Sequence, residues 1–395
     1  MVNLSNRMIM KMTYILLTAA FLAAACGKES HEPVNPQGGS PATVSNVQVE
    51  NLNGSAKITY SLPDDNDVLY VKATYEMRPG KTREVKSSYY NNFLVVDGFG
   101  DTLKHQIKLT VVTRSSVESA PVNVEVEPKL PPVLMIRRTF KVREDFGGVN
   151  LTFTNDTRAE IAIVAMTKDS TGKMKEFNTF YTKSVGTNYS LRGFEDTKRE
   201  FRFFVRDQYG NYSDTLTGDW VPMYERQLDR NKYREVILPG DIPDGWQFYP
   251  IPNLWAGTMW HSADKLDGMP MWITFDLGVV AQLSRIGLWQ RPNEWLYMQN
   301  NVRQIEIWGM ATTPPADGSW NGWTRLLEHT LIKPSGLPVG QLSQEDRDKG
   351  AAGEQMNVPL TMPKVRYIRV KILRTWTDGG YAANIQEMRF WGNDK

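Results

Sequence analysis

The fold of this chain is decided between Asn253 and Trp391, where the sequence reads Met271-Trp-Ile-Thr-Phe-Asp-Leu-Gly278 and then Leu283-Ser-Arg-Ile-Gly-Leu-Trp-Gln-Arg-Pro292. Further runs are Val302-Arg-Gln-Ile-Glu-Ile-Trp-Gly309, Val365-Arg-Tyr-Ile-Arg-Val-Lys-Ile372 and Asn384-Ile-Gln-Glu-Met-Arg-Phe-Trp391. Several of them alternate apolar with polar or charged residues, as a strand with one buried face requires. Helical patterning is nearly absent between them. Many short strands with long polar loops predict a β-sandwich or jelly roll.

The order of motifs in this stretch resembles the discoidin-like fold, the coagulation-factor type C family that also supplies galactose-binding-like carbohydrate modules. The segments that carry the resemblance are Trp260-His-Ser262, Trp272-Ile-Thr-Phe-Asp-Leu-Gly278, Ile286-Gly-Leu-Trp289, Arg366-Tyr-Ile-Arg-Val370 and Gln386-Glu-Met-Arg-Phe-Trp391. The resemblance implies a jelly roll over residues 253–395 that binds a ligand with loops at one end. It also places Arg291 where the family commonly has a ligand-binding arginine.

The first 26 residues form a targeting segment. Arg7 and Lys11 precede an apolar run, 14–25, that is too short to span a bilayer comfortably. Small residues lead into Cys26, the only cysteine of the chain, and Leu22-Ala-Ala-Ala-Cys26 resembles a bacterial lipobox. We therefore expect Cys26 to be lipidated and to attach the protein to the membrane. The lone cysteine also excludes an intramolecular disulfide framework.

Residues 27–41 are polar and rich in Pro, Gly and Ser, which predicts a flexible tether. Gly27 stands where an aspartate would suggest retention in the inner membrane, and a cluster of charged residues follows it. Such clusters resemble those of surface-exported lipoproteins in glycan-harvesting Gram-negative bacteria. We expect an outer-membrane location facing the exterior, although any solvated tether carries such charges.

Two small β-domains are predicted at residues 42–128 and 131–222. Candidate strands recur about every ten residues, with turn signals such as Pro63-Asp-Asp-Asn66 between them, which favours immunoglobulin-like or fibronectin type III-like sandwiches. The two domains look like distant repeats, because Val111–Ser119 corresponds in position to Val205–Ser213. Prolines near Pro131 predict a stiff, extended junction. Their simplest role is that of a spacer.

Residues 223–252 are predicted to link the second sandwich to the jelly roll. The mixed, charged segment from Arg226 to Val236 is compatible with one short helix, and turn residues follow it. The order of signal, tether, two sandwiches and a terminal discoidin-like module resembles lipoproteins of polysaccharide-utilisation systems.

Composition and motifs argue against several function classes. A formal net charge of +2 gives no electrostatic case for binding nucleic acid. The four histidines are well separated, and no Gly-x-Ser-x-Gly elbow or Gly-rich phosphate loop is present. Paired carboxylates could serve a glycosidase, and Glu294 and Asp378 lie in predicted loops, but a loop carboxylate is usually only solvated. We expect a protein without catalytic residues.

The discoidin-like family often carries a structural calcium ion near its first loop. Glu387 matches the late glutamate that often helps to hold this ion. Ala256, however, replaces the usual acid in a shortened loop. Calcium prefers several oxygen ligands, so one retained and one lost ligand leave this cofactor open. No other cofactor is predicted.

Aromatic residues in predicted loops are the main indication of a ligand. Sugars pack their C–H faces on aromatic rings, while their hydroxyls bond to Arg, Asn or acids. Two loop segments supply both kinds of residue, and their candidate glycan-binding residues are Arg291, Asn293, Trp295, Trp376 and Tyr381. The alternative is that these rings pin loops to the sandwich. Trp289, Trp308 and Trp391 lie within strand runs, and at least some of them are expected in the core.

The sequence therefore predicts an all-β, lipid-anchored envelope protein with two immunoglobulin/fibronectin-like sandwiches and a discoidin-like jelly roll. Its expected function is non-catalytic glycan binding in polysaccharide capture, with outer-membrane glycan-uptake proteins as partners. Two other functions stay open. One is a surface adhesion or scaffold protein that binds another protein. The other is a glycosidase or esterase with an unrecognised site.

Overall fold

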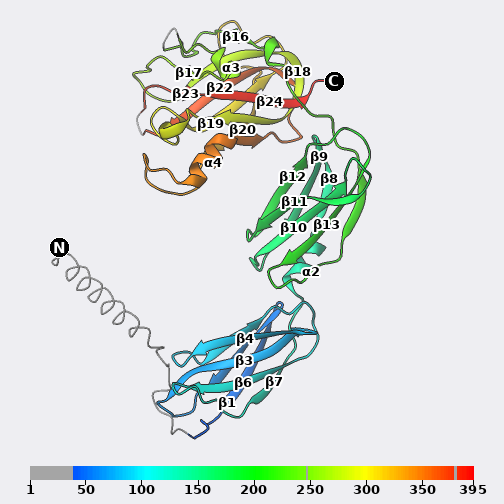
Figure 1. The fold of residues 1–395 in the computed structure, drawn as a ribbon. Helices are drawn as coiled ribbons and strands as arrows, with labels where there is room; N and C mark the ends of the chain where they lie inside the picture. Colours follow the sequence, from blue (N-terminus) through cyan, green and yellow to red (C-terminus); the bar gives the residue numbers. More distant parts are fainter. Residues whose placement is uncertain (1–38, 246–247, 378–379) are drawn as a thin grey trace, which may run out of the picture. The chain divides into compact units, whose positions relative to one another are not determined.

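The computed structural model describes residues 39–245, 248–377 and 380–395, and it is built from antiparallel β-sheets with a few short helices (Figure 1). The predicted all-β class is confirmed. Cys26, the signal segment and most of the tether lie outside the described residues. Within the described ranges, no helix is both long and apolar enough to cross a membrane.

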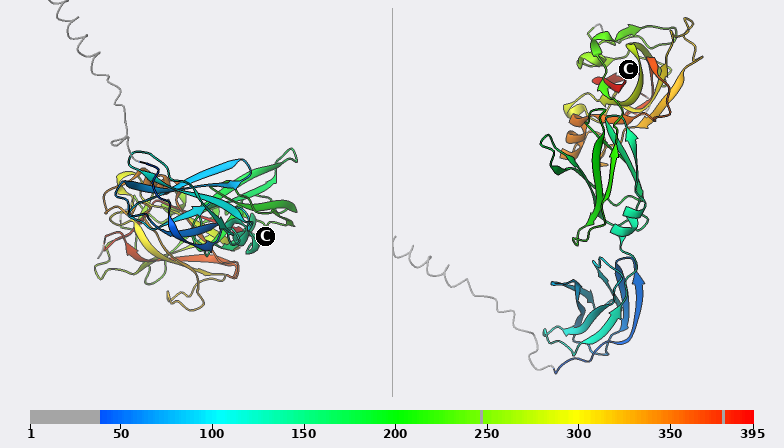
Figure 2. Two further views of the ribbon diagram at one scale, coloured as in Figure 1. Left: turned by 90° about the horizontal axis from the view of Figure 1, so that it is seen from below. Right: turned by 90° about the vertical axis from the view of Figure 1, so that its right-hand side faces the viewer.

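The first sandwich packs a three-stranded sheet on a four-stranded one, and the right-hand view of Figure 2 shows its two layers. One sheet has the order β1 (Ser45–Leu52), β2 (Ser55–Ser61), β5 (Phe93–Asp97). The other has the order β4 (Lys81–Ser88), β3 (Val68–Arg78), β6 (His105–Thr113), β7 (Val122–Val126). Alternate residues of β2 are buried, and Ala56, Ile58 and Tyr60 enter a core shared by both sheets.

The second sandwich repeats this arrangement. Its three-stranded sheet has the order β8 (Lys141–Asp145), β9 (Gly148–Thr154), β12 (Gly186–Arg192). Its four-stranded sheet has the order β11 (Met174–Thr182), β10 (Ile161–Lys168), β13 (Arg199–Asp207), β14 (Leu216–Trp220). The strands thus pair in the same relative order as in the first sandwich. The predicted repeat also extends to individual hydrogen bonds. Ser119 Oγ accepts from the Val111 amide at 2.9 Å, and Ser213 Oγ accepts from the Val205 amide at 2.9 Å.

The predicted extended junction is wrong just after Pro131, because α2 (Pro132–Arg138) begins there. Proline is well suited to the first helical position, since its fixed φ fits the helix and its missing amide has no acceptor there anyway. The helix ends with Arg137 and Arg138, which favourably face the carbonyl end of its dipole.

The segment 226–236 does not form the helix that its composition allowed. It forms β15 (Arg226–Gln227), the single 3-10 turn η1 (Arg230–Lys232) and β16 (Arg234–Val236). β15 pairs with β24 and β16 pairs with β18, so part of the expected linker belongs to the C-terminal sheet. Leu228 and Tyr233 enter the core five positions apart, a spacing that does not match one face of a helix.

The C-terminal module, from β15 to β24, is an eight-stranded sheet with a short two-stranded ribbon. The remaining strands of the sheet are β18 (Met271–Trp289), β19 (Val302–Met310), β20 (Thr324–Thr330), β21 (Glu354–Asn357), β22 (Val365–Thr375) and β24 (Glu387–Asn393). The ribbon consists of β17 (Trp260–His261) and β23 (Asn384–Ile385), and the short helix α3 (Asn253–Ala256) precedes it.

Strand β18 joins the two halves of this module. Its first part pairs with β22, its second part pairs with β24, and the register shifts between Asp276 and Ala281. The sequence predicted two separate strands here. Gly278 lies at the shift with a φ of 68°, and a Cβ on it would meet the Lys232 carbonyl oxygen at 2.4 Å. Glycine is therefore required where this long strand bends.

The module also contains a helix that the sequence analysis missed, α4 (Gln344–Ala352). Ser343 and Asp346 form a reciprocal capping box at its start, and Gly353 follows its last residue. The Ser-x-x-Asp spacing and the final glycine are visible in the sequence. The helix lacks the apolar stripe that marks most helices in a sequence.

Candidate functional site

Both predicted ligand-binding segments lie at one end of the C-terminal module, and Asn301 ties them together. Its buried side chain accepts from the Arg291 amide at 2.8 Å and donates to the Trp295 carbonyl at 2.6 Å. Its backbone carbonyl accepts from the Trp376 amide at 3.1 Å. We call this region, formed by residues 290–301, 376–377, 380–383 and the β17–β23 ribbon, the loop end.

The first predicted segment presents an arginine stacked on a tryptophan. The Arg291 guanidinium carbon lies 4.1 Å from the centre of the half-buried Trp295 ring. Stacking leaves the N–H groups at the edge of the guanidinium plane available for hydrogen bonds. Asn293, in η2 (Asn293–Trp295), is exposed and has a φ of 62°, a conformation that asparagine tolerates better than most residues.

The second predicted segment places its two rings differently. Trp376 is half-buried, packs edge-on against Tyr297 at 5.3 Å and lies under the Arg303 guanidinium at 5.0 Å. Its indole N–H is buried and has no hydrogen-bond acceptor among the described residues. Tyr381 is 56% exposed. Asp378, the other loop carboxylate considered above, lies outside the described residues.

Tyr297, another aromatic residue of the first segment, is buried and out of a ligand's reach. The ring is 2% exposed, and burial raises the pKa of its hydroxyl to about 12. Its backbone amide donates to Gln290 at 3.0 Å. Tyr297 therefore holds the loop against Trp376, which is the pinning role considered as the alternative for these aromatics.

Three further polar residues of the loop end, His261, Asn300 and Asn384, were not among the predicted glycan-binding residues. His261 Nε2 lies 3.3 Å from Asn300 Nδ2, and His261 pairs with Asn384 across the β17–β23 ribbon. The Asn384 side-chain oxygen is buried and has no donor in the described part of the chain. His261 and Asn384 stand in sequence runs quoted above, but only pairing between distant strands brings them together with Asn300.

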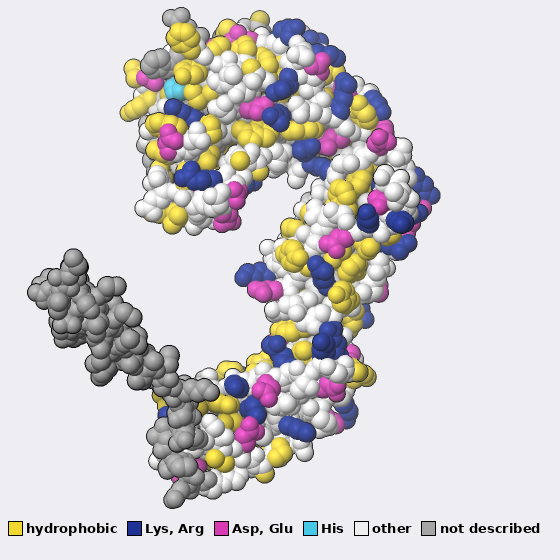
Figure 3. Space-filling view, in the orientation of Figure 1, with side chains coloured by type: hydrophobic (Ala, Val, Ile, Leu, Met, Phe, Trp, Pro, Cys, Tyr) yellow, Lys and Arg dark blue, Asp and Glu magenta, His cyan; other side chains and the backbone are white. Residues whose placement is uncertain are grey.

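Exposed apolar side chains flank these polar groups. Phe248 is 78% exposed and Leu266 is 85% exposed, and the backbone of neighbouring Lys265 donates to the Tyr381 carbonyl at 2.7 Å. Figure 3 shows hydrophobic side chains with a histidine and basic residues among them on this side of the module. The loop end thus offers apolar faces beside unsatisfied polar groups, a combination typical of small-ligand sites.

A pocket of about 390 Å³ opens beside the first segment. Its lining residues are Gly257, Trp289, Gln290, Pro292, Asn293, Leu296, Arg347, Gly350, Ala351, Gln386 and Glu387. We call it the α4 pocket, because α4 forms one wall and the end of β18 forms another. Of the predicted glycan-binding residues, Asn293 lines it.

The residues around Glu387 do not fit a calcium ion. Glu387 Oε1 accepts from Arg230 Nη1 at 2.8 Å and from Arg389 Nε at 2.7 Å, and Oε2 accepts from Arg389 Nη2 at 2.9 Å. Two cations thus already occupy both carboxylate oxygens. In the described ranges, no group of three or more His, Cys, Asp or Glu is arranged to hold a metal.

The strand tryptophans are half-buried rather than part of the core. Trp289 stacks with Arg389 at 4.6 Å, and Trp391 stacks with Arg285 at 4.1 Å. Trp308 instead packs edge-on against Trp320 at 5.0 Å. The alternation in the sequence predicted that these residues lie in strands, but it did not determine which face of the sheet is buried by other parts of the chain.

Two loop tryptophans, Trp320 and Trp323, serve the fold. The fully buried Arg369 guanidinium lies 4.6 Å from each of their rings. Arg369 also donates to Thr274 at 3.1 Å and to the Gly318 carbonyl at 3.2 Å. These contacts hold the loop on the sheet, so both rings are pinning residues.

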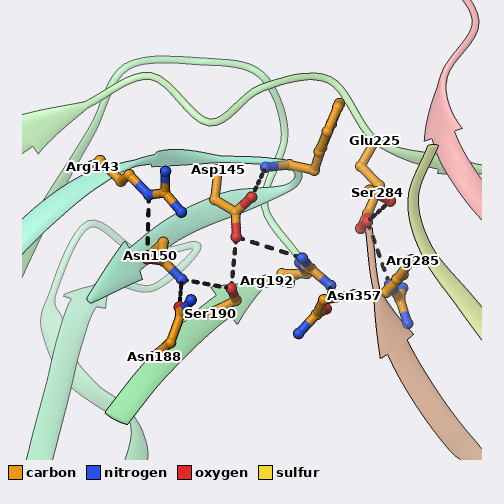
Figure 4. Close-up of polar contacts among 11 residues, drawn as sticks. Arg143, Asp145, Asn150, Asn188, Ser190, Arg192, Glu225, Ser284, Arg285 and Asn357 are labelled. Carbon is orange, nitrogen blue, oxygen red and sulfur yellow. Dashed lines mark hydrogen bonds and ion pairs between the residues drawn. The ribbon is translucent and has the colours of Figure 1, made fainter. Parts of the chain in front are cut away.

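A separate polar network joins the second sandwich to the C-terminal module (Figure 4). Asp145 accepts from Ser190 at 2.6 Å and from Arg192 at 3.5 Å, and Arg192 also donates to Asn357 of β21 at 2.9 Å. Glu225 accepts from Ser284 at 2.5 Å. Ser190 has a carboxylate partner here but no histidine base among the described residues, so the arrangement is that of a structural junction rather than a nucleophilic site.

Three domain families match the chain, each described as a domain of unknown function. They are DUF4959 over residues 41–128, DUF5126 over residues 129–231 and DUF5000 over residues 251–392. No curated protein matches the sequence.

Solved structures also match the chain. The chain is 33% identical to the SusE-like protein BT2857, in a match that covers 67% of this chain and 100% of that one, with a TM-score of 0.45. A two-domain fibronectin type III segment of chicken tenascin is 12% identical and covers 46% of this chain and 99% of its own, with a TM-score of 0.22. The chicken interferon gamma receptor alpha chain is 12% identical and covers 47% of this chain and 100% of its own, with a TM-score of 0.21. Because a third of the aligned residues are identical over the whole of BT2857, this chain belongs to the family of SusE-like proteins.

Proposed function

We propose that this chain is a non-catalytic glycan-binding lipoprotein, attached to the outer membrane through Cys26 and facing the exterior. It captures polysaccharide with the loop end of its C-terminal module and works beside outer-membrane glycan-uptake proteins. Membership of the SusE-like family supports this proposal. The order of domains in the sequence, which resembles that of polysaccharide-utilisation lipoproteins, is a second and independent support.

The observation that carries the proposal is the joining of both candidate segments by Asn301. The Arg291–Trp295 stack and the exposed Tyr381 ring lie in loops that leave the same end of the sheet. A sugar presents apolar C–H faces and a ring of hydroxyls, so it matches a surface of rings beside Arg and Asn donors. The eight-stranded sheet with ligand loops at one end supports the discoidin-like resemblance of this module.

A shallow site of this kind binds weakly. We expect a Kd between about 10 µM and about 1 mM, equivalent to about −7 to −4 kcal/mol. Many lipid-anchored copies on one surface raise the effective strength through multivalency. The two sandwiches act as the spacer that holds the binding module away from the membrane.

Glycan-array screening with plant, host and microbial polysaccharides, followed by calorimetry on the full chain, tests the proposal. Tyr381→Ala should weaken binding by at least about 1 kcal/mol, the lower range for a well-packed aromatic contact. Tyr90→Ala is the matched control, because Tyr90 is 80% exposed but lies in the first sandwich. Tyr381→Ala is also a cleaner variant than Trp376→Ala, since Trp376 packs against the core of the module.

A protein-binding role is the second candidate, and the exposed Phe248 and Leu266 favour it. Large apolar side chains beside an exposed tyrosine are common at protein interfaces. If the chain binds none of the polysaccharides of the panel, the glycan proposal is contradicted and the protein-binding role remains.

A further inference from the structure

The α4 pocket exists because one face of a short helix carries small residues. Arg347, Gly350 and Ala351 are spaced i, i+3 and i+4, so they lie on the same face of α4. The Trp289 indole N–H donates to the Ala351 carbonyl at 3.2 Å, which fixes the helix to the end of β18. The absence of a side chain on Gly350 leaves room for Leu296, whose Cδ1 would lie 2.7 Å from an added Cβ.

Amide groups in the pocket have bonding capacity left for a ligand. The side-chain oxygen of Gln290 accepts from the Tyr297 backbone amide at 3.0 Å, so the NH₂ group of the Gln290 side chain remains available. Gln386 donates to the Gly257 carbonyl at 2.7 Å, so its side-chain oxygen remains available. Asn293 makes no side-chain hydrogen bond to the described residues. Trp289, Pro292 and Leu296 add apolar walls, which gives the mixture of surfaces that a sugar ring needs.

The charge of the pocket is positive. Its one carboxylate, Glu387, is neutralised by Arg230 and Arg389, as described above. The exposed Arg347 guanidinium has neither an ion-pair nor a hydrogen-bond partner within the described ranges. Many other arginines of the module do pair with carboxylates, namely Arg226, Arg230, Arg285, Arg325, Arg366, Arg369 and Arg389. Arg347 is therefore an uncompensated cation among the residues that line the pocket.

We propose that the α4 pocket is a subsite for a sugar residue that bears a carboxylate, with Arg347 binding the acid group. This inference rests on the proposed glycan-binding function and names the ligand class for it. A planar guanidinium matches a carboxylate with two parallel hydrogen bonds, which a neutral hydroxymethyl group cannot reproduce. The amides of Gln290, Asn293 and Gln386 bind the hydroxyls of the same sugar residue.

The test compares each acidic glycan with its own neutral form. Calorimetry on the full chain uses oligogalacturonate, alginate oligomers and glucuronate-containing oligosaccharides, each beside the product of carboxyl reduction. At least one acidic form should bind about tenfold more tightly than its reduced form, and raising NaCl from about 50 to about 500 mM should remove most of this preference. Arg347→Gln should lose the preference while binding the neutral form as the parent does.

Arg374→Gln is the matched control. Arg374 is likewise exposed and unpaired among the described residues, but it lies on β22 and does not line the pocket. It should leave both affinities unchanged. Ala351→Trp, which places a large ring at the pocket wall, should abolish the preference for the acidic form.

The outcomes separate this inference from the function on which it rests. Equal binding of acidic and reduced forms by the parent would overturn the inference alone, as would an unchanged preference in Arg347→Gln. Failure of the parent to bind any acidic or neutral glycan would overturn the proposed function and this inference with it.

Discussion

Replacing Asn301 with alanine should disorganise the whole loop end. The side chain is 1% exposed and satisfies the Arg291 amide and the Trp295 carbonyl from one position. Alanine has no polar atom to replace these bonds, so both backbone groups lose their partner. We expect lower stability and, because Arg291 and Trp295 lose their fixed positions, weaker glycan binding.

The magnitude follows from the two orphaned groups. Leaving one buried polar group without a partner costs about 1–3 kcal/mol. Both groups lie near the surface, where water partly replaces the lost bonds, so the total should be about 2–4 kcal/mol. In proteins of about 150–250 residues, each kcal/mol shifts the Tm by about 2–4 °C, which predicts a shift of about 5–15 °C.

Tryptophan fluorescence is a suitable assay, because most tryptophans of the chain lie in the C-terminal module. Thermal unfolding of the full chain gives the Tm, and calorimetry with the glycan found on the array gives the affinity, which should fall at least about tenfold, or about 1.4 kcal/mol. Gln304→Ala is the control, since it removes only a surface hydrogen bond to Glu328 and should change stability by less than about 0.5 kcal/mol. An Asn301→Ala variant with the Tm and affinity of the parent would refute the organising role of this residue.

Three further predictions concern other parts of the chain. Cys26→Ala should block incorporation of labelled fatty acid and shift the protein out of the detergent phase; labelling equal to that of the parent would contradict lipid attachment. A fragment of residues 226–395 should unfold in a single cooperative transition, because β15 and β16 belong to its sheet; solubility only as a fusion to the second sandwich would show that it does not fold alone. Burial raises the pKa of Asp276, but hydrogen bonds and charge from Arg366 lower it overall. This carboxylate therefore stabilises the fold above the unfolded pKa of about 3.9. The contribution is lost as the pH falls through the depressed pKa of the folded state. Urea unfolding of Arg366→Ala should therefore show a smaller loss of stability between about pH 5 and about pH 2 than the parent shows, and an equal loss would speak against this ion pair.

The sequence was most informative where a strand buries alternate residues. The alternation in Ile305-Glu-Ile307 and in the matching run of β22 predicted both strands, and the two pair in the sheet. The correspondence of Val111–Ser119 with Val205–Ser213 also predicted a repeat that extends to equivalent hydrogen bonds. Such features depend on local residue order, which is visible in the sequence itself.

The sequence was less informative where distant segments meet. Arg291 and Trp376 were predicted separately, but nothing in either segment names Asn301, which joins them. Helix α4 was missed because it has no apolar stripe, although its capping box at Ser343 was visible. The lining of the α4 pocket comes from four separate regions of the chain, so only their packing reveals the pocket.

On the two proposals above, affinity and specificity reside in different residues of the C-terminal module. An exposed ring such as Tyr381 packs against the C–H face of many sugars, so its loss should lower the affinity for all ligands by a similar factor. Arg347 acts on one functional group, so its loss should change the order in which acidic and neutral glycans bind. Asn293 lies in the first predicted segment and also lines the α4 pocket, so it should affect both properties. A single chain of sugar residues could therefore be held by the rings of the loop end while one acidic residue occupies the pocket.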